Sequence, residues 1–158
     1  MTVANATWGQ VYFQMTEDQQ REVCRWAGWP YERTFKVPIS DLEVRVIRIL
    51  HGLGWHGVSQ GCDSVPSARE YAYQCPVPGT RLAIDFAFAD RLLEAHGCHY
   101  HACEVCGDSS WPGIREADAE RARRIFSITG MWHEVVWNHE TTEEMTAHIR
   151  RFLELEVR

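Results

Sequence analysis

Residues 81–96 read Arg-Leu-Ala-Ile-Asp-Phe-Ala-Phe-Ala-Asp-Arg-Leu-Leu-Glu-Ala-His. The first half is rich in β-forming residues, Ala89-Asp90 favours a turn, and a short apolar run follows, so the stretch predicts an antiparallel hairpin. One carboxylate interrupts each strand, at Asp85 and at Glu94. A carboxylate buried alone is costly. We therefore expect Asp85 and Glu94 to lie side by side near the strand ends, close enough to share one metal ion.

Helix and strand signals on both sides of this hairpin predict the order of the elements. Capping boxes at Thr16–Gln19, Ser40–Glu43 and Thr141–Glu144 each predict the start of a helix. The other expected elements are a strand at 70–77, a helix at 114–129 and a strand at 133–137.

Three strands in a meander, followed by a helical crossover to a fourth, predict a mixed sheet flanked by helices, and hence an α/β fold. We expect residues 1–39 to form an N-terminal helical extension packed on the core. Residues 40–158 would form the functional domain and end in a C-terminal helix. The cysteine-rich segment after the hairpin reads as irregular structure.

The chain has 158 residues and a formal net charge of −6. This length suits one domain with a sizeable core. The acidic balance argues against tight, autonomous binding of nucleic acid, although arginines gather locally at Arg121, Arg123 and Arg124. No apolar stretch is long enough to span a bilayer, and the N-terminus has no secretory pattern. We therefore expect a cytoplasmic protein without a membrane partner.

Three of the six cysteines gather at Cys98, Cys103 and Cys106. Cys103-Glu-Val-Cys106 has the spacing of tetrahedral zinc sites on a tight turn. In a reducing compartment the cluster predicts a structural zinc ion, and the scattered cysteines read as buried thiols. The rival interpretation is a redox dithiol. Within the segment, His99 or His101 can supply a fourth zinc ligand.

Four acidic and imidazole side chains follow one another in a suggestive order. Glu43 lies on a predicted helix, Asp85 on a strand, and Glu94-Ala-His96 at the end of the next strand. This order resembles the PD-(D/E)XK nuclease core, an αβββαβ arrangement in which an Asp and a Glu on a hairpin hold Mg²⁺. The resemblance implies that Asp85 and Glu94 bind Mg²⁺ or Mn²⁺, which generates hydroxide and neutralises the scissile phosphate. His96 stands where the family usually has a lysine.

Two further motifs resemble those of very-short-patch-repair (Vsr) endonucleases, which nick DNA at mismatches. His96-Gly-Cys-His-Tyr-His101 looks like their His-Gly-Cys-Phe-Trp-His motif. Gly130-Met-Trp-His-Glu-Val-Val-Trp137 looks like their Gly-Trp-Arg-Val-Leu-x-x-Trp strand. The resemblance spans residues 40–154 approximately.

The Vsr resemblance also implies roles for individual residues. It makes the zinc ligands Cys98, Cys103, Cys106 and His139. It makes the catalytic residues Asp85, His96 and His101, with Glu43 from the first core helix. Glu94 stands where those enzymes have an apolar residue, and its catalytic role follows from the general PD-(D/E)XK pattern.

In this scheme His101 acts as a general acid or base. His99 and Tyr100 occupy the positions of the Phe-Trp pair that those enzymes wedge into the base stack. The Arg-Asp pair on the family's crossover helix has no clear match here, and the nearest candidates are Asp118 and Glu120.

The same residues also have plain structural interpretations. Glu43 can serve only to complete the capping box with Ser40. Asp85 can be an edge-strand carboxylate paired with an arginine such as Arg81, and Glu94 with His96 can end a solvated strand. Four histidines follow no pattern and are expected at the surface or hydrogen-bonded in the core: His51, His56, His133 and His148.

Three functions compete at this point. The leading hypothesis is a Mg²⁺-dependent DNA endonuclease with a structural zinc, which nicks because each chain carries one active site. The second is a catalytically inactive, zinc-stabilised module of the same fold that binds nucleic acid or protein. The third is a thiol oxidoreductase. DNA is the expected partner, and a protein partner or a homodimer is also open.

Overall fold

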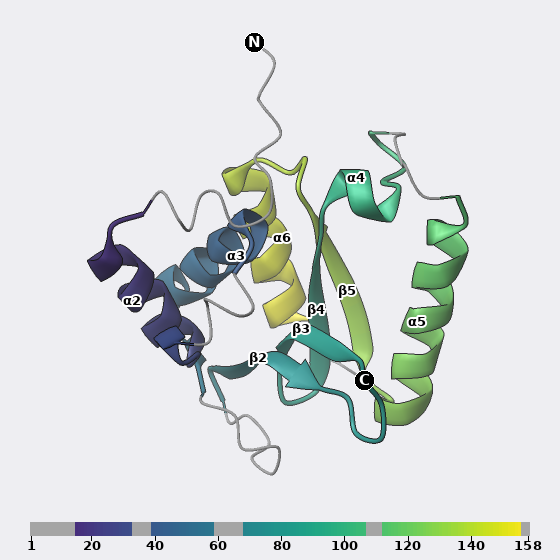
Figure 1. Ribbon diagram of the computed structural model, residues 1–158, viewed down its shortest axis with the longest axis horizontal. Helices are drawn as coiled ribbons and strands as arrows, with labels where there is room; N and C mark the ends of the chain where they lie inside the picture. Colours follow the sequence, from purple (N-terminus) through teal and green to yellow (C-terminus); the bar gives the residue numbers. More distant parts are fainter. Residues whose placement is uncertain (1–14, 33–38, 59–67, 107–111, 156–158) are drawn as a thin grey trace.

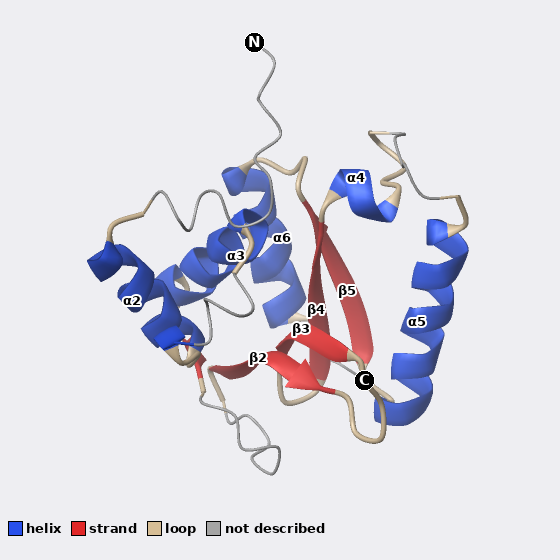
Figure 2. Cartoon of the chain, viewed as in Figure 1, coloured by secondary structure: helices blue, strands red, loops and turns tan. Residues whose placement is uncertain are grey.

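The computed structural model describes residues 15–32, 39–58, 68–106 and 112–155. Within these ranges five strands form one mixed sheet in the order β1-β2-β3-β4-β5, with helices on both faces (Figures 1 and 2). The strands are β1 (His56–Gly57), β2 (Glu70–Pro76), β3 (Ala83–Ala87), β4 (Arg91–His96) and β5 (Trp132–Trp137). The helices are α2 (Glu17–Ala27), α3 (Asp41–Gly52), α4 (Cys98–His101), α5 (Ile114–Thr129) and α6 (Thr142–Glu154). The α/β class is therefore confirmed.

The core elements follow the predicted order. Strands β2, β3 and β4 form an antiparallel meander, and α5 then crosses over to β5, which pairs with β4 in parallel. All three predicted capping boxes form, at the starts of α2, α3 and α6. Each cap satisfies backbone N–H groups that the first turn of a helix leaves without partners.

Two elements were not expected from the sequence. The cysteine-rich segment is not wholly irregular, because Cys98–His101 forms the short helix α4, which ends at Ala102 with a left-handed φ of 50°. Strand β1 is only two residues long and runs parallel to β2. An element this short carries no readable periodicity, since it forms through pairing with a neighbour that is distant in sequence.

The sheet packs unequally on its two faces. On one face α2, α3 and α6 (purple, blue and yellow in Figure 1) bury Val23, Leu50 and Phe152 against Tyr71 and Phe86. On the other face α5 contributes a single buried side chain, Ile125, to a smaller apolar cluster. The thin packing under α5 leaves space for polar side chains from β4 and β5.

Part of the predicted N-terminal extension is described, and it packs on the core. Val23, Cys24 and Ala27 of α2 belong to the same apolar cluster as α3. Residues 1–14 and 33–38 of the extension lie outside the described residues. None of the helices in the described ranges is long and apolar enough to cross a membrane.

A backbone contact joins the end of α2 to β1. A Cβ atom added to Gly57 would lie 2.1 Å from the carbonyl carbon of Ala27, far inside contact distance. Gly28, which ends α2 with a φ of 63°, meets the backbone of Gly57 and Val58 in the same way. Both positions therefore require glycine.

We predict that Gly57→Ala separates α2 from the sheet edge and lowers the free energy of unfolding by about 3 kcal/mol, because backbone atoms cannot move aside as a side chain can. Urea denaturation measures this change. Gly52→Ala is the matched control, since an added Cβ meets nothing within 4 Å at the end of α3. It should leave stability unchanged or slightly higher, and equal losses in both variants would contradict the contact.

Candidate functional site

Three carboxylates converge at one end of the sheet, from α3, β3 and β4. Gln74 joins the first two, because its Nε2 donates to Glu43 Oε1 at 2.8 Å and to Asp85 Oδ1 at 3.0 Å. The Glu94 carboxylate lies close enough to Asp85 for its charge to raise the pKa of Asp85. Glu43 and Glu94 are only 5% and 3% exposed, which excludes a solvated strand end for Glu94. We call Glu43, Asp85 and Glu94 the carboxylate cluster.

Asp85 lies where β3 and β4 separate. The paired residues of this hairpin are Ala87 with Leu92 and Phe86 with Leu93, so the next step of the register would set Asp85 opposite Glu94. There the Asp85 carboxylate accepts the N–H of Ala95 at 2.9 Å in place of a backbone carbonyl. Asp85 accepts hydrogen bonds from Gln74 and Ala95. Among the contacts found for the described residues it makes no hydrogen bond or ion pair with Arg81, the arginine that one interpretation gave as an example of its partner.

Gln74 belongs to the candidate site but was missed by sequence reasoning. It has a left-handed φ of 51°, which is unfavourable for a residue with a side chain. In a regular strand residues two apart share a face. Here Tyr73 packs in the α3 core whereas Cys75 packs on the α5 side, so the strand reverses its faces at Gln74. This reversal directs the Gln74 amide toward Glu43 and Asp85. We find no feature of the sequence that predicts the reversal.

Glu43 completes the helix cap and also belongs to the carboxylate cluster. Its Oε2 accepts the Ser40 N–H at 2.9 Å, and its Oε1 accepts the Tyr73 hydroxyl at 2.9 Å and the Gln74 amide. The helix cap therefore fixes the direction of the carboxylate. These hydrogen bonds also hold the Glu43 side chain in place within the carboxylate cluster.

The cluster carries more negative charge than its surroundings offset. Burial, and next the charge of Glu94, raise the pKa of Asp85 to about 7. Burial also raises the pKa values of Glu43 and Glu94. Arg121 of α5 opposes this at Glu94, where its Nη1 lies 2.5 Å from Oε1. Carboxylate oxygens are the ligands that Mg²⁺ and Mn²⁺ prefer, although among the described residues Glu43, Asp85 and Glu94 do not form a group whose donor atoms all lie within 4.8 Å of one another.

Two histidines stack beside the cluster. His96 ends β4 and is 8% exposed, and its ring lies 3.9 Å from that of His101 at an angle of 13°. His101 Nδ1 lies 2.9 Å from Asp118 Oδ2, so α5 supplies a carboxylate that orients this imidazole. Burial, together with the neighbouring histidines, lowers the pKa of His96 to about 3. His96 is therefore neutral near pH 7.

The donor atoms of His96, His101 and Asp118 lie within 4.8 Å of one another, as in some metal sites. The stacking argues against one ion held by both histidines. Lone pairs of parallel rings run side by side instead of converging on a point. The His101–Asp118 pair instead has the geometry of a general acid–base dyad.

A second cluster forms on the other side of α4. Cys98, Cys103, Cys106 and His139 bring their donor atoms within 4.8 Å of one another and can hold a metal ion such as zinc. His139 Nδ1 lies 3.2 Å from the sulfurs of Cys98 and Cys103. Three sulfurs and one imidazole nitrogen suit tetrahedral zinc.

The two thiols nearest His139 differ in their environment. Burial raises the pKa of Cys98 to about 12. Burial opposes ionisation of Cys103 as well, but the backbone N–H groups of Cys106 and Val105 point at its sulfur, and its pKa is lowered. N–H groups aimed at a thiolate are a usual support for a metal–sulfur bond.

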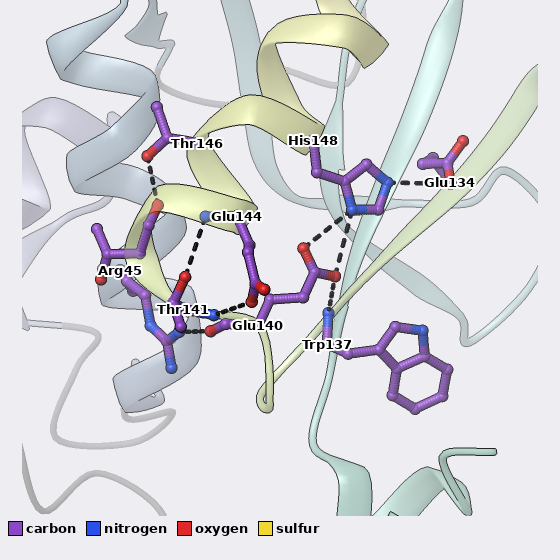
Figure 3. A network of polar contacts seen from close by, with 9 residues as sticks. Arg45, Glu134, Trp137, Glu140, Thr141, Glu144, Thr146 and His148 are labelled. Atoms are coloured by element: carbon purple, nitrogen blue, oxygen red, sulfur yellow. Dashed lines mark hydrogen bonds and ion pairs between the residues drawn. The ribbon is translucent and has the colours of Figure 1, made fainter. Parts of the chain in front are cut away.

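His139 lies on the β5–α6 turn. Contacts with residues of two helices hold this turn in place (Figure 3). Arg45 of α3 donates from Nη1 to the Glu140 carbonyl at 2.6 Å. His148 of α6 contacts the Glu140 carboxylate at 3.0 Å and that of Glu134 at 3.2 Å. The turn is therefore anchored to the helix that carries Glu43 and to the C-terminal helix.

A pocket of about 480 Å³ opens between α5, β4 and β5, with α4 at its rim. Its lining includes His96, His101, Asp118 and His133, and Cys103 and His139 of the cysteine cluster, whereas the three members of the carboxylate cluster do not line it. The hollow exists because α5 presents small residues, Ala119 and Ala122, to the sheet at this level. A substrate group can enter here and meet the His101–Asp118 dyad.

The structure brings most of the predicted residues together. Of the two helix carboxylates that the sequence offered, Asp118 contacts His101, whereas Glu120 pairs with Arg123 on the surface. His51 and His133 were both expected at the surface or hydrogen-bonded, yet His51 Nδ1 and His133 Nε2 are buried without a hydrogen-bond partner. The ring of His51 stacks on Trp26, which packs against the larger core. The side chain of His99 lies outside the described residues.

Comparison with known proteins does not add a family. No family model, no curated protein and no solved structure matches the chain. Any function assigned to the site is therefore argued from its geometry alone.

We predict that Glu94→Gln lowers the pKa of Asp85 from about 7. The new amide still accepts from Arg121 and can donate to Asp85. A carboxyl whose pKa is raised by folding contributes stability below its unfolded pKa and loses it as pH rises through the folded pKa. The variant should therefore gain about 1 kcal/mol of stability at pH 8 and less at pH 5.

Urea denaturation at the two pH values, without added divalent metal, measures this difference. Glu120→Gln is the control, since its ion pair with Arg123 is exposed and should contribute little at either pH. A gain of equal size at pH 5 and pH 8 would show that charge repulsion is not its cause.

Proposed function

We propose that the protein is a metal-dependent endonuclease that hydrolyses phosphodiester bonds in DNA, and that it is a Vsr-like member of the PD-(D/E)XK superfamily. The convergence of Glu43, Asp85 and Glu94 beside the His101–Asp118 dyad carries the proposal. A meander whose strands separate at a carboxylate, with a crossover to a parallel strand, supports the same superfamily. One such site per chain suits the nicking of one strand.

Each residue has a role that its contacts support. Asp85 and Glu94 would bind a divalent ion, which supplies a Lewis acid for the phosphate and lowers the pKa of water. His101 would transfer a proton to or from the reacting oxygen through Nε2, since Asp118 engages Nδ1. His96, neutral and buried under the His101 ring, would hold that ring in place.

The cysteine cluster would act as a structural zinc site. A zinc ion there would join α4 to the β5–α6 turn, because Cys98 belongs to the helix and His139 to the turn. His101 ends the same short helix. A helix of one turn is unstable alone, so the metal would fix the position of the catalytic imidazole.

A specific contact favours a second candidate, a catalytically inactive zinc-stabilised module that binds nucleic acid or protein. Arg121 donates to Glu94 Oε1 at 2.5 Å and to the Ala83 carbonyl at 2.7 Å. A guanidinium in this position offsets part of the charge that a metal ion would otherwise neutralise. Under this alternative the ion pair is permanent and the protein cleaves nothing.

We predict that the purified protein nicks supercoiled plasmid in the presence of Mg²⁺ or Mn²⁺. Asp85→Asn should abolish nicking because it removes a charged metal ligand. His101→Ala should lower the rate by about 100-fold or more, as expected for loss of general acid–base catalysis. Agarose gel electrophoresis of the plasmid follows the reaction.

His56→Gln serves as the control for purification and handling, since this exposed histidine lies on β1, at the far edge of the sheet. It should nick as the wild type does. Equal nicking by wild type and Asp85→Asn would point to a contaminating nuclease and remove the support for this function.

We further predict about one zinc ion per chain in the purified protein. Cys103→Ser should lose the zinc and lower the melting temperature, because Cys103 is buried at the centre of the cluster. Cys75→Ser, outside the cluster, should keep the zinc. Elemental analysis measures the zinc content, and thermal denaturation measures the melting temperature. A wild-type protein that contains no zinc but has a reducible disulfide would favour the oxidoreductase function instead.

A further inference from the structure

The imidazole of His133 lies in the pocket wall with a buried nitrogen that no hydrogen bond satisfies. Its Nε2 is covered by protein atoms and has no hydrogen-bond partner. Glu94 Oε1 lies 3.8 Å from it, beyond hydrogen-bonding distance, and the charge of Arg121 also acts on His133. A buried polar atom without a partner is unfavourable, and in native proteins it calls for an explanation such as an ion.

The sheet register explains how His133 comes to face Glu94. In the parallel pair β4–β5, Leu92 lies beside His133 and Glu94 beside Val135. Alternate residues of each strand share a face, so Glu94 and His133 both project toward α5. Since β4 lies between β3 and β5, Glu94 has Asp85 on one side and His133 on the other.

We propose that His133 is a ligand of the catalytic metal ion, and that its Nε2 and the Glu94 carboxylate hold the same divalent ion. The ligand pair makes the site selective for a transition-metal ion of the Mn²⁺ class over Mg²⁺. This inference rests on the proposed function and specifies its cofactor.

The distance between the two donor atoms suits a shared ion. With metal–ligand bonds of about 2.1 Å, adjacent ligands of an octahedral ion lie about 3.0 Å apart and opposite ligands about 4.2 Å apart. The 3.8 Å between Glu94 Oε1 and His133 Nε2 falls between these limits. An ion can therefore lie between these two atoms once Glu94 Oε1 turns from Arg121, whereas Asp85 does not join them in a group of described residues with all donor atoms within 4.8 Å of one another.

The chemistry of the ligands sets the preference. Mg²⁺ takes oxygen ligands almost exclusively, whereas imidazole nitrogen suits first-row transition metals. His96 is a weaker candidate for the nitrogen ligand, because its ring is stacked on His101. His133 carries no such stacking contact among those found for the described residues.

Arg121 modulates the site. Its guanidinium contacts the same Glu94 oxygen at 2.5 Å, so a divalent ion must compete with it. The side chain is 27% exposed, and its second bond, to the Ala83 carbonyl, can hold it nearby when Glu94 turns to the ion. Competition of this kind weakens binding of every metal ion and leaves the preference unchanged.

The test uses zinc-loaded, full-length protein and His133→Val, which places a β-forming residue of similar breadth on β5. Free Mn²⁺ is measured by its electron paramagnetic resonance signal, and Mg²⁺ affinity by competition against Mn²⁺. His133→Val should bind Mn²⁺ at least about 10-fold more weakly and Mg²⁺ with a change of about 2-fold or less. Pulsed spectra of wild-type protein with Mn²⁺ should show coupling to a ligand nitrogen, which the variant lacks.

Without added metal, His133→Val should melt about 2–4 °C higher than wild type, because it removes the unsatisfied nitrogen. Circular dichroism and zinc content establish that the variant is folded. His56→Gln, which removes an exposed histidine at the far edge of the sheet, should match the wild type in every measurement.

Two results separate the inference from the proposed function. Wild type that binds Mn²⁺ without nitrogen coupling, or His133→Val that binds it as wild type does, overturns the role of His133 and leaves the nuclease proposal standing. Binding that also survives in Glu94→Gln and Asp85→Asn places the ion elsewhere and overturns both.

Discussion

The hydrogen bond from the Ala95 N–H to the Asp85 carboxylate is the contact on which the site depends. It takes the place of a backbone bond at the point where β3 and β4 separate. A side chain in the ladder opens the end of the hairpin without leaving the β4 backbone unsatisfied. The Gln74 side chain on β2 donates hydrogen bonds to Asp85 and to Glu43 of α3. Glu94 of β4 is a further neighbour of Asp85.

This arrangement buries carboxylates whose ionised form is unfavourable in the folded protein. Burial raises the pKa of each member of the carboxylate cluster, and Arg121 is the cation whose contact with it is direct. Apolar packing elsewhere has to offset that cost, and the α2–α3–α6 face supplies the larger core. Strain at Gln74 adds to the cost. Local features that oppose folding are expected where a protein binds a ligand or catalyses a reaction.

The short helix α4 couples the two clusters. Gly97 separates them: His96 and Glu94 precede it in β4, and Cys98 follows at the first helical position. One turn later His101 faces Asp118 of α5, while Cys98 and Cys103 face His139. A metal ion in the cysteine cluster therefore acts on the position of His101 through a single helical turn, and the β5–α6 turn that bears His139 is itself anchored by Arg45 and His148 (Figure 3).

The sequence by itself determined the features that arise from local interactions. Strand propensity and a turn predicted the hairpin with Asp85 and Glu94, side chains three residues apart predicted the caps, and the cysteine spacing predicted a metal cluster. Only the tertiary structure decided the left-handed Gln74, the choice of Asp118 over Glu120, and the approach of Arg121 and His133 to Glu94. Those contacts join side chains 17 to 39 positions apart, and their directions follow from strand register and from how α5 packs on the sheet. No residue pattern within either element encodes that packing.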